Sequence, residues 1–255
     1  MKTTLRAALT GAVICLGLWA AACGGKEEAP PAPAAVSNPV DPATAGGITG
    51  TIRLEGTPPA PQPIDVSSDP YCEKQAGQST ETVAAGSGST LQNVFVYVKD
   101  GLGDRAFPVP STSVVLDQKG CRYTPHVLGV RVAQKIEIVN SDPTLHNIHA
   151  MPKSNQEFNT GQPIQGMKFD HSFTQKEVMV PFKCDVHGWM NAYGGVLEHP
   201  FFAVSDASGK FEIKGLPPGD YTIEAWHEKL GTQEQKITVG AKESKEANFA
   251  FKMTS

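Results

Sequence analysis

The stretch that decides the fold is VMVPFKCDVHGWMNAYGGV, residues 178–196. A period-2 alternation predicts a strand whose inward face carries Val178, Val180, Phe182 and Cys184. His187 and Met190 follow on a tight loop, so a thiolate, an imidazole and a thioether reach one point. Soft sulfur ligands combined with imidazole favour copper, and a trigonal His₂Cys site with a weak axial Met is typical of blue-copper electron transfer.

Such a site needs a second histidine, and His146 in NSDPTLHNIHA (140–150) is the obvious candidate. It follows two strand-like runs whose inner face is expected to carry Leu128, Val130, Val132, Ile136 and Ile138. His149 faces the opposite side of a regular strand and is expected to lie outside the site. The remaining histidines are expected on the surface or in hydrogen bonds, with His199 placed to approach the metal from outside its ligands; they are His126, His171, His199 and His227.

The Cys-x2-His-x2-Met loop resembles that of the cupredoxins, and of the amicyanin type in particular. Asn140 and the pair His146-Asn147 resemble the segment that carries the first histidine in that family, and the likeness spans residues 108–198. The resemblance implies a Greek-key β-sandwich with one type 1 copper, whose ligands are His146, Cys184, His187 and Met190.

The same resemblance assigns roles to residues around the ligands. Asn147 would tie the two ligand loops together by hydrogen bonding. The edge of His187 would reach the surface as the port for electrons, with Trp189 and Tyr193 as the apolar residues around it. Gly188 stands where a dinuclear purple copper centre needs a second cysteine, so that centre is not expected.

Short alternating runs after Glu198 predict a second β module. Asp206, Gly209, Phe211 and the run GLPPGDY (215–221) resemble the carboxypeptidase regulatory-like, or transthyretin-like, β-sandwich. These residues set turn geometry and carry no chemistry.

Such a module usually opens with a G-x-I-x-G-x-V run, and the best match is GITGTI at 47–52. We therefore expect residues 46–107 and 199–255 to form one discontinuous domain, into which the cupredoxin domain, 108–198, is inserted. The alternative is a sequential order, with the cupredoxin followed by a small β module.

The rest of the chain supports an all-β fold class. The 25 glycines, the 20 prolines and the many short alternations favour strands over helices. Residues 91–99 are apolar on both faces and predict a central strand, while residues 167–173 predict an edge strand. Residues 152–165 show no period, and residues 64–88 predict a long loop.

The amino end predicts export. Lys2 and Arg6 precede an apolar run that is too short for a membrane span, which is typical of a signal peptide over residues 1–22. The sequence before Cys23 resembles a bacterial lipoprotein box with Cys23 as the lipidated residue, although ordinary cleavage near the alanines is the alternative. Residues 23–45 then form a Pro- and Ala-rich tether. We expect a periplasmic or cell-envelope lipoprotein that meets the membrane only through its lipid.

Two cysteines remain once Cys15, Cys23 and Cys184 are assigned. In an oxidising compartment Cys72 and Cys121 most simply form a disulfide, and the alternative is two separate reduced thiols.

The net charge of the chain and its sequence motifs disfavour several classes of function. Loss of Lys2 and Arg6 changes the net charge from −4 to −6, which disfavours nucleic acid as a partner. No Ser-His-Asp order, phosphate-binding glycine loop or paired-carboxylate pattern is present, and a nitrite reductase or multicopper oxidase needs a further copper site. The sequence therefore predicts a non-enzymatic carrier of single electrons between redox partner proteins. The alternative is a binding module, resembling carbohydrate-binding folds, or a copper-handling protein with an auxiliary copper site.

Overall fold

The computed structural model describes residues 39–75 and 77–253, and almost all of its regular structure is β-strand. The all-β fold class is confirmed. The expected signal peptide and Cys23 lie outside the described residues. Among the described residues, no helix has the length and apolar character needed to cross a membrane.

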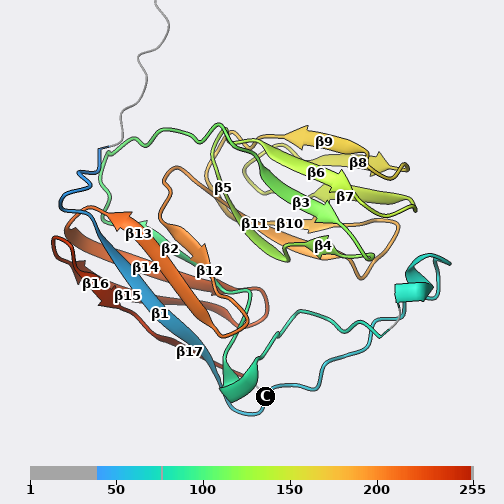
Figure 1. The fold of residues 1–255 in the computed structure, drawn as a ribbon, viewed down its shortest axis with the longest axis horizontal. Coiled ribbons are helices and arrows are strands. Elements are labelled where there is room, and N and C mark those ends of the chain that lie inside the picture. Colours follow the sequence, from blue (N-terminus) through green and yellow to red (C-terminus); the bar gives the residue numbers. More distant parts are fainter. Residues whose placement is uncertain (1–38, 76, 254–255) are drawn as a thin grey trace, which may run out of the picture. The chain divides into compact units, whose positions relative to one another are not determined.

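Two sheets built from the middle of the chain form what we call the central sandwich (Figure 1). One sheet has the order β5 (Val127–Arg131), β11 (Asn191–Leu197), β10 (Glu177–Lys183), β7 (His146–Ala150) and β8 (Phe158–Gln162). The other has the order β4 (Tyr123–Thr124), β3 (Val114–Gln118), β6 (Ile136–Asn140) and β9 (Lys168–His171). The expected edge strand at 167–173 is therefore present as β9.

The core between these sheets follows the period-2 pattern of the sequence. Leu128, Ile138, Val180 and Phe182 are among its buried members, and Cys184 joins the same core. Val178 does not, contrary to the expectation from alternation. The pairing of β10 with β11 shifts register between Glu177 and Val180, and Val178 consequently packs in a different apolar cluster together with Met179.

The two ends of the described chain form the terminal sandwich. In one sheet β1 (Gly46–Glu55) pairs with β13 (Lys210–Leu216), β16 (Ser244–Glu246) and β17 (Phe249–Lys252). The other sheet has the order β12 (Phe202–Val204), β2 (Phe95–Asp100), β14 (Gly219–His227) and β15 (Gly231–Val239). Strand β1 thus pairs with strands that follow it by more than 150 residues. The run GITGTI at 47–52, which matches the opening of a regulatory-like module, lies within β1.

Strand β2 is apolar on both faces because each face packs against a different core. Val96 and Val98 point into the terminal sandwich. Phe95 and Tyr97 belong to a second cluster, in which they pack with residues of the central sandwich such as Leu197. The prediction of a central strand at 91–99 is confirmed, with β2 beginning at Phe95.

In the described residues between β1 and β2, the regular structure consists of two short 3-10 turns, Cys72–Gln75 and Ser87–Ser89, and the rest is irregular as expected. We call residues 56–94 the crossing loop. The expected disulfide is confirmed: it joins Cys72 of this loop to Cys121 of the central sandwich.

Two buried histidines predict acid sensitivity of the fold. Burial lowers the pKa of His199 and of His227 to about 4, and each Nδ1 accepts backbone N–H groups, from Phe201 in the first case and from Lys229 and Leu230 in the second. Because the unfolded chain binds these protons near pH 6.5 and the native chain does not, stability is lost as the pH falls through this range.

For His227, stability should fall by about 2 kcal/mol between pH 7 and pH 5. The check is urea unfolding of the wild type and of His227→Asn, whose amide oxygen is able to accept the same N–H bonds without titrating. The variant should show the smaller loss over this interval. Equal losses in the two proteins would contradict the assignment.

Candidate metal centre

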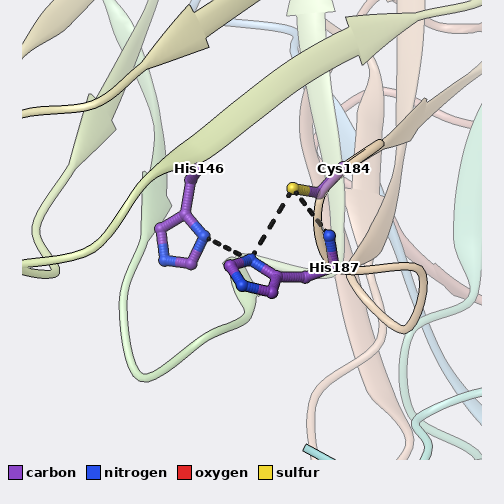
Figure 2. A group of neighbouring side chains, drawn as sticks. All are labelled: His146, Cys184 and His187. Carbon is purple, nitrogen blue, oxygen red and sulfur yellow. Dashed lines mark hydrogen bonds between the residues drawn. The ribbon is translucent and has the colours of Figure 1, made fainter. Parts of the chain in front are cut away.

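Three side chains that the sequence singles out converge at one end of the central sandwich (Figure 2). His146 is the first residue of β7, Cys184 follows β10 directly, and His187 lies three residues further on. Their exposed fractions are 0%, 1% and 2%. The Nδ1 atoms of the two histidines are 2.9 Å apart, and Cys184 Sγ lies 3.9 Å from His187 Nδ1.

Backbone hydrogen bonds close the loop that carries the remaining predicted ligand. The N–H of Met190 donates to the carbonyl of His187 at 2.9 Å, and the N–H of Cys184 donates to the carbonyl of Met190 at 3.1 Å. The N–H of His187 points to Cys184 Sγ at 3.3 Å. Met190 is 1% exposed and packs in the same core as Cys184. The loop therefore holds three of the four predicted ligands in a small closed ring.

Asn147 joins the two ligand-bearing segments. It neighbours His146 on β7, and its side-chain oxygen accepts the N–H of Asp185 at 2.5 Å. Its side-chain amide also donates to Asn159 of β8. This residue thereby links the His146 strand to the Cys184 loop.

Two carboxylates that the sequence analysis did not single out hold the outer nitrogens of the histidines. Asp142 Oδ2 lies 2.9 Å from His146 Nε2, and Asp69 Oδ2 lies 3.4 Å from His187 Nε2. When a carboxylate accepts a hydrogen bond from Nε2–H, the Nδ1 atom is left with its lone pair free for a metal ion. Both histidines therefore present Nδ1 toward Cys184.

The electrostatics of the centre favour a thiolate. Burial opposes ionisation of Cys184, but hydrogen bonds from His146 and from the N–H groups of Asn147 and His187 outweigh it and lower the pKa of the thiol. Burial likewise opposes ionisation of Asp69, yet the N–H groups of Cys72 and Tyr71 with the Thr144 hydroxyl hold its pKa at about 2.

The same surroundings shift the pKa values of the two histidines in opposite directions. Burial acts against the charged form of His146, but Asp142 and Cys184 raise its pKa to about 8. Burial and the neighbouring His146 lower the pKa of His187, an effect that Asp69 only partly offsets. The neutral imidazole that a metal needs is thus favoured at His187.

The crossing loop covers His187, so the expectation that this histidine reaches the surface is wrong. Cys72 Sγ lies 3.9 Å from His187 Nε2, on the side that was expected to be the electron port. Trp189 packs against the imidazole at a tilt of 38° with ring centres 5.0 Å apart, and its Nε1 donates to the carbonyl of Cys121. The disulfide and Trp189 together close this edge of the centre.

The other residues considered for the site lie away from it. Tyr193 packs against Trp226 and His126 and so is not part of the edge of His187. His149 faces the other side of β7, where it contacts Asp185 and Glu157.

The remaining histidines have separate environments. His126 binds Glu228 at 2.6 Å, and His171 packs between Phe158 and Phe173. His199 stacks on Phe201, which belongs to the core of the terminal sandwich, and not on a residue of the metal centre.

The donor set fits one metal ion. The ligand atoms of His146, Cys184 and His187 all lie within 4.8 Å of one another, and metal bonds to nitrogen or sulfur are about 2.0 to 2.3 Å long. His187 Nδ1 lies 2.9 Å from His146 Nδ1 and 3.9 Å from Cys184 Sγ, and both separations are short enough for one ion to bind the paired atoms together. Two imidazoles and one thiolate, with a thioether close by, are the ligand set of a trigonal copper site.

Comparison with known proteins supports the second predicted module. Residues 196–252 match the carboxypeptidase regulatory-like domain, so that resemblance is confirmed over β12 to β17. No curated protein gives a significant match to the sequence.

Several solved structures are similar to part of the chain. A copper-containing nitrite reductase from Thermus scotoductus SA-01 is 20% identical over 40% of this chain and 26% of its own, with a TM-score of 0.33. A mutant amicyanin in the Cu(I) form is 20% identical over 34% and 85%, with a TM-score of 0.30. A purple cupredoxin from Nitrosopumilus maritimus is 20% identical over 33% and 98%, with a TM-score of 0.29. This chain thus spans about a quarter of the reductase.

Proposed function

We propose that this protein is a type 1 copper protein that carries single electrons between redox partners. The observation that supports it best is the convergence of His146 Nδ1, His187 Nδ1 and Cys184 Sγ in a buried site, beside the equally buried Met190. Bound copper would supply the change between Cu(I) and Cu(II), with Met190 as the weak axial ligand. We assign no catalytic residue to the chain.

The surroundings of the ligands suit electron transfer because they restrict ligand movement. Asp142 and Asp69 fix the imidazoles at their outer nitrogens, and Asn147 fixes the two segments relative to each other. A site whose ligands stay in place in both oxidation states needs little reorganisation when an electron arrives or leaves.

With the edge of His187 covered, a partner would approach the centre elsewhere. Leu145 and Val186 directly precede the two histidines, and they are 43% and 45% exposed although apolar. We infer that a redox partner protein contacts the molecule at these two side chains.

The proposed location is the periplasm or cell envelope, with a lipid on Cys23 as the anchor. The Cys72–Cys121 disulfide supports an oxidising compartment. Mass spectrometry of the protein purified from membranes tests the anchor, because lipidation adds acyl mass to the peptide that begins at Cys23. An unmodified Cys23 would contradict it.

A redox titration separates the carrier from the alternative of copper handling. A carrier should show a reversible one-electron couple with fast exchange. Tight binding of Cu(I) that is slow to exchange electrons but is passed to a competing chelator would favour copper handling. The observation that favours copper handling as a second function is the disulfide beside His187.

The carboxylate beside His146 should control metal affinity. Asp142→Asn should weaken Cu(II) binding by about 10- to 100-fold, because the imidazole loses the partner that fixes its orientation and strengthens its donor nitrogen. Titration against a chelator of known affinity measures this change. Asp170→Asn is the matched control, since Asp170 is exposed and forms an ion pair with Lys135. Equal affinities in both variants would contradict the role of Asp142.

A further inference from the structure

The disulfide lies against the outer side of the metal centre. Cys72 and Cys121 are both fully buried, and they pack with Val66, Tyr71 and Trp189. Cys72 Sγ is 3.9 Å from His187 Nε2, the nitrogen that points away from Cys184. The sulfur atoms are therefore neighbours of the centre without being part of its donor set.

Two further donor groups meet at this disulfide. Asp69, Cys72 and His187 offer ligand atoms within 4.8 Å of one another, and so do Cys121, Asp142 and His146. The S–S bond joins the first group to the second. As long as that bond is intact, both sulfurs are poor ligands, because it is the thiolate that binds metals.

We propose that reduction of the Cys72–Cys121 disulfide creates a second site, which binds Cu(I) between the two thiolates. The Cα atoms are 5.7 Å apart, so both sulfurs are able to reach one ion. Soft thiolate ligands select Cu(I). The Asp69 carboxylate lies beside Cys72 as a further donor.

A dithiol is the reductant that opens the Cys72–Cys121 disulfide. The dithiol attacks the protein disulfide through a mixed disulfide, and the products are two protein thiols and the oxidised dithiol. Binding of Cu(I) by both thiolates then releases two protons. A disulfide oxidant that accepts two electrons restores the Cys72–Cys121 bond and expels the Cu(I).

The two thiols should stay together after reduction because other contacts hold the crossing loop in place. The hydroxyl of Thr144 donates to Asp69 at 2.7 Å, and that of Tyr71 donates to Asp142 at 3.0 Å. Gln78 donates to the carbonyl of Gly120 at 2.7 Å, next to Cys121. These hydrogen bonds span the same gap as the disulfide and do not depend on it.

This site adds copper handling that is controlled by thiol–disulfide exchange. Since it uses neither Cys184 nor Met190, its test stands apart from that of the type 1 centre. The purified protein is reduced anaerobically with a phosphine, freed of reductant and titrated with Cu(I) against a chromophoric chelator. Reduced wild type should bind one Cu(I) per chain more than untreated wild type.

Two protein variants and a spectroscopic measurement make the result specific. Cys184→Ser should still gain one Cu(I) on reduction, and alkylation of its reduced thiols should remove that gain. The double variant Cys72→Ser with Cys121→Ser should gain none. X-ray absorption of copper in reduced Cys184→Ser should show two sulfur neighbours. No gain on reduction in wild type and Cys184→Ser, or copper with only nitrogen and oxygen neighbours, would overturn the proposal.

Discussion

Cys184→Ser should abolish the intense visible absorption of the Cu(II)-loaded protein. Among the residues that the structure describes, Cys184 is the one cysteine outside the disulfide. Its buried Sγ accepts the N–H of His187 and faces the Nδ1 atom of the same residue, so it supplies the thiolate of the proposed centre. A serine hydroxyl in its place does not ionise at neutral pH and supplies no charge transfer from sulfur to copper. Visible spectra of wild type and variant at equal copper loading measure the effect.

Two histidine variants provide the matched control for this experiment. His146→Gln should also lose the colour, because it removes one Nδ1 donor. His149→Gln should keep it, since His149 lies on the other face of β7 against Asp185 and Glu157. Colour that survives in Cys184→Ser would show that the ligand assignment is wrong.

Loss of the disulfide should strongly destabilise the fold. The bridge closes a loop between residues 49 positions apart, and in the chain-entropy account such a bridge stabilises by about 4 kcal/mol. The double variant Cys72→Ser with Cys121→Ser should therefore unfold at lower denaturant concentration, with a free energy of unfolding reduced by about that amount. Urea unfolding monitored by tryptophan fluorescence measures it.

Chemical reduction of the disulfide provides an independent measure of its contribution to the free energy of unfolding. Reduced wild type should lose as much stability as the double variant, whereas the double variant should lose nothing further when reductant is added. A loss of less than about 1 kcal/mol in both would contradict the role of the bridge.

The sequence pattern predicted strands where the side chains alternate clearly. The two runs before His146, at 126–132 and 135–139, became β5 and β6, because one face of each meets an apolar core. Strand β8 was not predicted, since its residues are mostly polar and only its backbone pairing with β7 makes it a strand. Val178 was assigned to the wrong face because a register shift is not visible in a period-2 pattern.

The centre was predictable to the extent that its residues are close in sequence. Cys184, His187 and Met190 come from one loop, and the structure brings His146 to the same loop. Asp69 lies more than 100 residues from His187, in a segment without periodicity, so no pattern pointed to it. Asp142 precedes His146 by only four residues, and that short spacing was the one available signal.

Sequence patterns also could not predict that the crossing loop covers His187. A pair of unassigned cysteines predicts a bridge, but not what the bridge lies against. The crossing loop brings Cys72 to the outer nitrogen of His187 only because Cys121 follows β3 at the same end of the central sandwich. Burial of His187 is therefore a property of the whole fold and not of its local sequence.

The most direct test of the type 1 assignment is the visible absorption and EPR spectrum of the purified protein after addition of one equivalent of Cu(II). The account predicts an intense thiolate-to-copper band together with a narrow copper hyperfine splitting. A pale protein with a broad hyperfine splitting would show that Cys184 does not bind the ion, and would contradict the account.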